Sequence, residues 1–243
     1  QNQPWYIQMV SLTEAMAKKM GYAKVCDMQK AVAQRIKEYV ATGGFLFAMC
    51  SATDSYDISL ACQHIDICAP MFDGDPADDA VNSKMEFDQT FAFENFQLIT
   101  NPQIYEFSTI DVQYNPMSHR PDLDFFTLFD FSAKFDPVPT MLTQCHYNVV
   151  HGFMGQTTSF RKQYIKKNVT ILAQRDGTDE VKYICGNVGK GSFAWFGGHD
   201  PEDYTHSVGD PPTELKLFKN SPGYRLILNN VLFPAAKKKK LKT

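Results

Sequence analysis

The chain has 243 residues, of which 44% are hydrophobic and 21% are charged, and this composition is that of an ordinary globular protein rather than a disordered, collagen-like or coiled-coil one. Its 24 basic and 27 acidic residues give a net charge of -3, too balanced for the broad basic face with which proteins bind nucleic acid. The longest apolar runs fall far short of the roughly 20 residues that cross a bilayer. We therefore expect residues 1–243 to form one domain, with no membrane span and no nucleic-acid partner.

The first residue is Gln1 rather than Met, so we expect the natural N-terminal portion to be missing. The compartment stays open, with a lean to the periplasm or to secretion if an export signal was removed. A missing portion would leave a sheet edge or an apolar helix face exposed, and a homodimer could cover such a surface.

The six cysteines form no Cys-x-x-Cys pair, which excludes a zinc ribbon. Cys62, His64 and Cys68 could ligate a metal, and the two thiols could pair in an oxidising compartment, but buried reduced cysteines are the commoner reading. The acidic segment 73–79 lacks the twelve-residue loop of a calcium site. We expect no metal and no cofactor.

An amphipathic helix is predicted after Asp27. Asp27 can cap it, apolar residues recur every four positions from Met28 to Val40, and Gly43-Gly44 ends it. Residues 45–49 are apolar without alternation, which is typical of a strand covered on both faces in a parallel sheet. Another helix is predicted after Cys50, and this order of elements indicates an α/β fold.

Long loops are predicted between 73 and 136, over one end of the sheet. Residues 181–188 and 192–196 predict a glycine-linked β-hairpin whose second strand leads to His199, and Ser221 can cap a last helix. The expected fold is a three-layer, flavodoxin-like α/β domain, with a mostly parallel sheet between helices on both faces. Open sheets of this kind bind ligands at their carboxyl edge.

Cys50 is the sharpest candidate for chemistry. A nucleophile on a tight strand-to-helix turn needs small residues two positions to either side, and Ala48 and Ala52 meet this need. The N-terminus of the following helix would stabilise a thiolate there. The alternative, an inert cysteine buried after a core strand, has equal weight on spacing alone.

His199 is the second candidate. It follows a predicted strand and precedes carboxylates at Asp200 and Glu202. A thiol nucleophile works best with a histidine that takes its proton and a carboxylate that orients the histidine. The same residue types also form ordinary polar turns.

Together these features resemble the class I glutamine amidotransferase-like superfamily, and within it the trehalose-utilisation-type branch and a related Bacteroidetes group sometimes labelled asparagine synthetase B. In that superfamily a cysteine elbow follows the central strand and a His-Pro-Glu segment follows a late strand. The sequence has no Ser-Gly-Gly-x-Asp-Ser nucleotide loop, so we do not adopt the synthetase label. The resemblance spans most of the chain and is carried by Gly43-Gly44-Phe45, Cys50, Gly152 to Thr158, Gly189-Lys190-Gly191, Gly197-Gly198-His199-Asp200 and Tyr224 to Ala236.

The resemblance implies a cysteine-dependent hydrolase or amide-transfer domain that acts on a small-molecule substrate. The sequence departs from the family in having alanines for glycines at the elbow, an acid one or three positions after the histidine rather than two, and no glycine-bearing oxyanion loop upstream of the elbow. The implied roles are Cys50 as nucleophile, His199 as base, Glu202 or Asp200 as orienter of the histidine, and the Ser51 and Ala52 amides as oxyanion donors.

The alternative is a non-catalytic domain that binds a carbohydrate or a partner protein. His151, Gln156 and Arg161 lie in or near the segment 152–158 and could line a pocket for an anionic or sugar-like ligand. Close approach of the Cys50 sulfur to the His199 ring would favour chemistry, and separation by packed side chains would favour binding.

Overall fold

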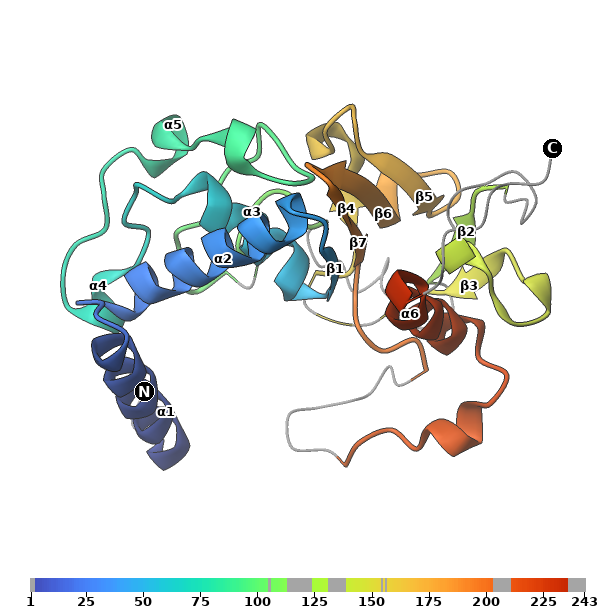
Figure 1. The fold of residues 1–243 in the computed structure, drawn as a ribbon, viewed down its shortest axis with the longest axis horizontal. Helices are drawn as coiled ribbons and strands as arrows, with labels where there is room; N and C mark the ends of the chain where they lie inside the picture. Colours follow the sequence, from blue (N-terminus) through green and yellow to red (C-terminus); the bar gives the residue numbers. More distant parts are fainter. Residues whose placement is uncertain are drawn as a thin grey trace.

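A computed structural model describes residues 3–104, 106–112, 124–130, 139–153, 155, 157–202 and 211–235. These residues form a curled seven-stranded sheet with helices around it (Figure 1). The helices are α1 (Pro4–Lys19), α2 (Val25–Ala41), α3 (Ser51–Ala61), α4 (Pro70–Asp73), α5 (Val81–Lys84) and α6 (Pro222–Leu232). The strands are β1 (Phe45–Met49), β2 (Phe125–Leu128), β3 (Val149–His151), β4 (Phe160–Arg161), β5 (Thr170–Gln174), β6 (Glu180–Val188) and β7 (Gly191–Phe196).

The prediction of a mostly parallel, three-layer flavodoxin-like sheet is wrong. The strand order is β1-β7-β6-β5-β2-β3, with β4 paired to β6, and β1 with β7 is the parallel pair while the other pairs are antiparallel. Short turns join β5 to β6 and β6 to β7, and a chain that reverses within a few residues can only pair antiparallel. The prediction took the apolar run of β1, which is typical of a parallel strand, as representative of the whole sheet.

Several elements predicted from the sequence are confirmed. The strand at 45–49, the helix after Cys50 and the hairpin of β6 and β7 are all present. Ser221 caps α6 as expected, since its Oγ accepts a hydrogen bond of 3.2 Å from the backbone N–H of Tyr224. The helix α2 begins two residues before the predicted cap, with Lys24 at the N-cap position.

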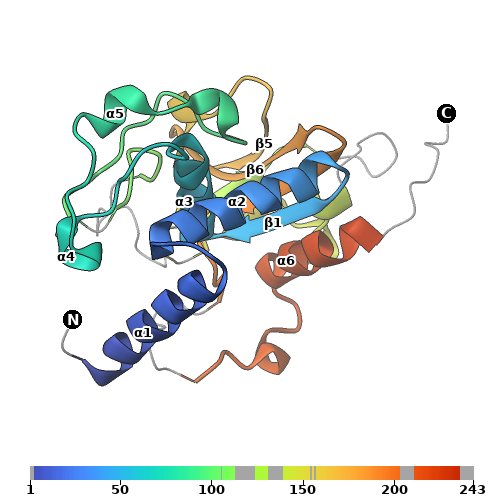
Figure 2. The ribbon, with the colours of Figure 1, turned by 60° about the vertical axis from the view of Figure 1, so that its left-hand side comes forward.

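The strand β7 is buried on both faces from Phe193 to Phe196, which explains why these four residues are all apolar. Phe193 and Trp195 face a core that they share with α2 and α3, whereas Ala194 and Phe196 face a second core that includes Leu226 of α6. Its neighbour β1 lies between α2 and α6 (Figure 2). The helices on both sides thus hold the β1–β7 pair in place.

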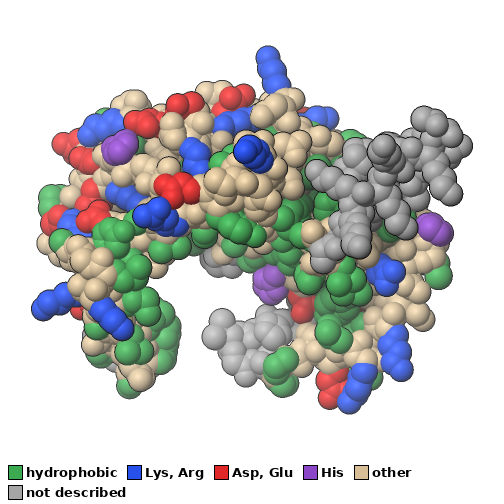
Figure 3. All heavy atoms as spheres, viewed as in Figure 1, with side chains coloured by type: hydrophobic (Ala, Val, Ile, Leu, Met, Phe, Trp, Pro, Cys, Tyr) green, Lys and Arg blue, Asp and Glu red, His purple; other side chains and the backbone are tan. Residues whose placement is uncertain are grey.

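The helix α1 projects from the body of the protein and carries apolar side chains on its surface (Figure 3). Leu12 is 61% exposed and Met16 is 55% exposed, whereas Ala17 is buried. None of the described helices is both long and apolar enough to cross a membrane.

Candidate functional site

The parallel pairing of β1 with β7 brings Cys50 and His199 to the same edge of the sheet. Met49, the last residue of β1, lies opposite Phe196, the last residue of β7, so both chains leave the sheet at one point. The backbone N–H of Cys50 then donates to the carbonyl oxygens of Phe196 at 3.2 Å and Gly198 at 3.1 Å. The nucleophile candidate is therefore tied directly to the turn that carries His199.

The backbone of Cys50 is strained. Its φ of 56° and ψ of -143° lie in a region that non-glycine residues rarely adopt. Such a turn between a strand and a helix is the geometry of a nucleophile elbow, in which the side chain is pushed out from the sheet edge. The expected strand-to-helix turn is present, with the thiol partly buried at the start of α3, and its nucleophilic role stays a prediction.

The backbone of Gly155 lies against both candidate groups. A Cβ atom placed on Gly155 would be 2.9 Å from Sγ of Cys50 and 2.7 Å from Cδ2 of His199. The thiol and the imidazole ring therefore contact the same small region, and the distance between these two atoms cannot exceed the sum of the two values. No wall of packed side chains separates them.

Gly198 allows the turn that carries His199 to pack closely against the backbone of Phe153. Its φ is +83°, and a Cβ there would lie 1.6 Å from the carbonyl oxygen of Phe153. Only glycine fits a left-handed backbone in such close contact. The backbone N–H of Gly198 also donates to the carbonyl oxygen of Thr157 at 2.5 Å.

Ser51 and Ala52 occupy the first two positions of α3. Amides in the first turn of a helix have no acceptor within the helix, so they remain available to an oxygen near the Cys50 thiol. The amide of the residue after a nucleophile is a usual oxyanion donor. Their expected role is compatible with this placement and stays a prediction.

The two candidate orienting carboxylates have different surroundings. Asp200 accepts hydrogen bonds from the Tyr224 hydroxyl at 2.9 Å and the Thr213 hydroxyl at 3.1 Å, and also from the backbone N–H of Glu202 at 3.0 Å. These bonds fix the turn that follows His199 onto α6. The side chain of Glu202 instead lines a small cavity.

This cavity has a volume of about 210 Å³ and brings together Glu202, His151 and Tyr147. His151 is exposed, and its ring meets the Phe125 ring edge-on with centroids 4.2 Å apart. Arg161 does not line this cavity. Its Nε donates to the backbone carbonyl of Asp111 at 3.2 Å.

Gln156, the remaining predicted ligand-binding residue, lies outside the described residues. The sequence reasoning also missed Gly155, Thr157 and Asp54 as parts of the site. The segment 152–158 stood out only through the family resemblance, and neither spacing nor periodicity indicated that Gly155 lies next to Cys50.

A larger cavity, of about 520 Å³, lies on α3 away from the elbow and is lined mainly by apolar groups, with Cys26, Cys62 and Cys68 among them. Burial raises the pKa of the Cys62 thiol to about 11, so this thiol stays protonated at neutral pH. Protonated thiols are poor nucleophiles and poor metal ligands. We assign no chemistry to this cavity.

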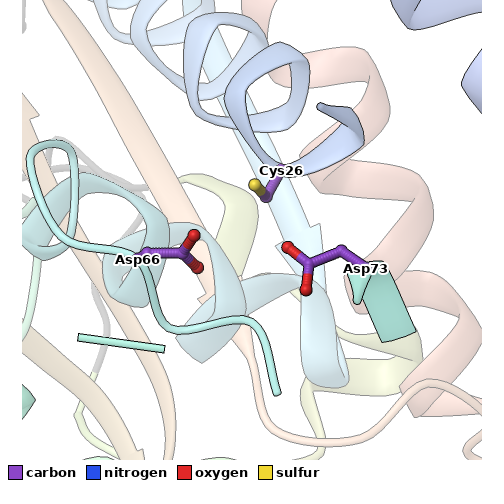
Figure 4. Close-up of side chains that lie close together, drawn as sticks. All are labelled: Cys26, Asp66 and Asp73. Atoms are coloured by element: carbon purple, nitrogen blue, oxygen red, sulfur yellow. The ribbon is translucent and has the colours of Figure 1, made fainter. Parts of the chain in front are cut away.

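Within the described ranges, Cys26, Asp66 and Asp73 form the group whose spacing could hold a metal ion (Figure 4). The ammonium group of Lys24 already lies between the carboxylates, 2.9 Å from Asp66, 3.4 Å from Asp73 and 2.5 Å from Asp75. Hydrogen bonds to Asp75 and Asp66 raise the pKa of Lys24, so it remains charged. A lysine thus supplies the positive charge that these acids require.

In comparisons with known proteins, the sequence matches no family model and no curated protein.

Proposed function

We propose that this chain is a cysteine-dependent hydrolase or amide-transfer domain, as its resemblance to the glutamine amidotransferase-like proteins implies. The observation that supports the proposal most directly is the contact of Gly155 with both Cys50 Sγ and the His199 ring, next to a strained elbow. The proposal requires that a ring nitrogen of His199 lie within hydrogen-bond reach of the thiol, because proton exchange between the two groups is the first requirement for nucleophilic catalysis.

The proposed reaction proceeds through a thioester. The Cys50 thiol gives its proton to His199, and the sulfur attacks the carbonyl carbon of an amide to form a C–S bond. The C–N bond then breaks as His199 returns the proton to the leaving amine. Water, or another amine in a transfer reaction, releases the acyl group and restores the thiol. The amides of Ser51 and Ala52 are the proposed donors to the oxyanion, where each donor contributes typically 10²–10³ in rate.

Asp200 is the carboxylate that we expect to act on His199, as a positioning residue. Its bonds to Tyr224 and Thr213 hold the adjacent turn, whereas Glu202 belongs to the neighbouring cavity. These contacts favour Asp200 over Glu202 as the acid that positions His199. We expect Glu202 to contribute to substrate binding instead.

Selective alkylation tests the proposal, with an internal control in the same molecule. Cys145 is exposed and lies outside the elbow, so it reports the reactivity of an ordinary accessible thiol. Treatment with limiting iodoacetamide at pH 7, followed by peptide mass spectrometry, should modify Cys50 faster than Cys145. The His199→Asn variant should slow Cys50 and leave Cys145 unchanged. Equal rates for the two thiols in the wild type would overturn the proposal.

Catalysis itself is measured as ammonia release from L-glutamine. We expect Cys50→Ser and His199→Asn to abolish release while the fold is retained. If the wild type releases no ammonia from L-glutamine, but the His199→Asn variant still slows alkylation of Cys50, the thiol is activated for a different amide.

The second candidate is a binding domain for a carbohydrate, and the cavity of about 210 Å³ favours it. An exposed Tyr147 ring can cover the apolar face of a sugar, and the side chains of Glu202 and His151 can bond its hydroxyls. Titration with trehalose followed by NMR would detect this. Binding that Glu202→Gln removes and Cys50→Ser leaves intact would support the binding function over the catalytic one.

A further inference from the structure

Asp54 is a buried acid on the helix that carries the elbow. It lies four residues after Cys50, in the first turns of α3, and is only 1% exposed. Side chains of a helix point back towards its N-terminus, so the carboxyl group extends towards the elbow. Its Oδ1 accepts hydrogen bonds from the Thr157 hydroxyl at 3.1 Å and the Ser55 backbone at 2.9 Å. Within the described part of the chain, its Oδ2 has no hydrogen-bond partner.

Thr157 belongs, with Gly152, Phe153, Gly155 and Thr158, to the described residues that we call the covering segment. It is 1% exposed, its hydroxyl bonds to Asp54, and its carbonyl oxygen accepts the backbone N–H of Gly198. Gly155, two residues earlier, is the residue that contacts Cys50 and the His199 ring. One threonine thus connects the elbow helix, the covering segment and the histidine turn.

The ends of the covering segment are fixed by other contacts. Gly152 donates its backbone N–H to the Asp124 carbonyl at 2.8 Å, and the Thr158 carbonyl accepts from the Lys182 ammonium at 2.9 Å. These anchors hold the segment to β6 and to the residue before β2. The Asp54–Thr157 hydrogen bond attaches the segment to α3, the helix that begins after Cys50. It therefore helps to hold Gly155 next to the thiol.

We infer that Asp54 is a positioning residue, which acts through the Thr157 hydroxyl to hold Gly155 and the histidine turn in contact with Cys50. The inference rests on the proposed function in assuming that this contact governs the reactivity of Cys50. A buried carboxyl oxygen without a hydrogen-bond partner is costly and calls for an explanation, and a positioning role at the site provides one. Burial also raises the pKa of Asp54 to about 7.

Asp57 provides a matched control on the same helix. It is also fully buried, but its carboxylate accepts three backbone N–H groups, from Phe91, Ala92 and Phe93 at 2.7–2.9 Å. These bonds hold residues 91–93, and none of them involves Thr157. A substitution there perturbs a buried acid of α3 without breaking the bond to Thr157.

The test compares Thr157→Val, which removes the hydroxyl at nearly constant shape, with Thr157→Ser, which keeps it. We expect Val to slow alkylation of Cys50 relative to Cys145 by roughly tenfold, because small misplacements at reactive sites have large effects on rate. Ser should restore a rate close to that of the wild type. Asp57→Asn should lower the unfolding temperature yet leave the ratio of the two alkylation rates unchanged.

Hydrogen exchange of the backbone amides of the covering segment and of Gly198 supplies a readout that does not depend on thiol reactivity. We expect faster exchange in Thr157→Val and not in Thr157→Ser. Equal exchange in these two variants, or an equal loss of Cys50 reactivity in Asp57→Asn, would overturn the inference. If wild-type Cys50 reacts no faster than Cys145, the proposed function fails, while the exchange result still decides whether Asp54 positions the segment.

Discussion

At the scale of single residues, two backbone positions create the candidate site. Cys50 adopts an unfavourable left-handed conformation that its bonds to Phe196 and Gly198 sustain. Gly155 leaves open the space into which the thiol and the His199 ring project. The reactivity of the thiol should therefore depend on the absence of a side chain at position 155.

The Gly155→Ala variant tests this dependence. The added methyl group would come within 3 Å of both Cys50 Sγ and the His199 ring, so one of the two side chains must move. We expect Cys50 alkylation to fall by about ten- to a hundredfold relative to Cys145, and the unfolding temperature to fall as well, because the φ of +157° is unfavourable for alanine. Gly177→Ala is a control for backbone strain, since Gly177 also has a positive φ, of +71°, but a Cβ there meets no atom within 4 Å. An unchanged rate in Gly155→Ala would mean that the contact with Gly155 does not control the thiol.

At the scale of elements, a buried ion pair joins β6 to the start of β2. The ammonium of Lys182 lies 3.3 Å from Oδ2 of Asp124, and the two side chains are 1% and 0% exposed. The ammonium also holds the Thr158 carbonyl, so the pair supports the segment over the site. Removing one partner leaves a buried group without its counter-charge, which is far more costly than removing both.

Lys182→Met should therefore lower the free energy of unfolding by about 3–5 kcal/mol, as measured by urea denaturation. The double variant Lys182→Met/Asp124→Leu should recover a large part of this loss. Lys190→Met, at an exposed turn, should change the free energy by no more than about 0.5 kcal/mol. A double variant as unstable as the single one would show that the lysine acts through packing rather than charge.

At the scale of the whole molecule, buried acids make stability depend on pH in an unusual direction. Burial raises the pKa of Asp54 to about 7, and burial together with the charge of Asp54 raises that of Asp111 to about 8. In the unfolded chain both groups titrate near pH 4, so between about pH 4 and pH 8 the folded protein binds more protons. The stability that they contribute is complete below pH 4 and is lost as pH rises through 7 and 8.

We expect the unfolding temperature to fall between pH 5 and pH 8.5, and the double variant Asp54→Asn/Asp111→Asn to show a smaller fall by calorimetry. Asp66 is the control, because its hydrogen bond to Lys24 lowers its pKa. Its contribution is lost only as pH drops below about 4, so Asp66→Asn should leave the slope unchanged in this range. An identical fall in the double variant would rule out these two acids as its cause.

The homodimer expected from the sequence remains a prediction at this scale. The exposed apolar side chains of α1, with Leu12 and Met16 among them, form the surface that a second copy would cover. The edge position of β1 in the sheet is a second such surface.

The sequence by itself determined the local elements around the site. A four-residue apolar repeat and a double glycine are enough to specify α2 and its end, an unbroken apolar run specifies β1, and Ser221-Pro222 specifies the start of α6. The elbow at Cys50 followed from small neighbours on either side. The two helices and the strand depend on interactions between residues close in the chain, whereas the backbone of Cys50 is held by bonds to the distant Phe196 and Gly198.

Only the tertiary structure decided the direction of the sheet and the surroundings of the thiol. The apolar run of β1 predicts a strand, but not whether its neighbours run parallel or antiparallel, and most of the strand pairs are antiparallel. The contacts of Cys50 with Gly155, and of Asp54 with Thr157, join residues about a hundred positions apart. No local pattern encodes such contacts, because they arise from packing after the chain has folded.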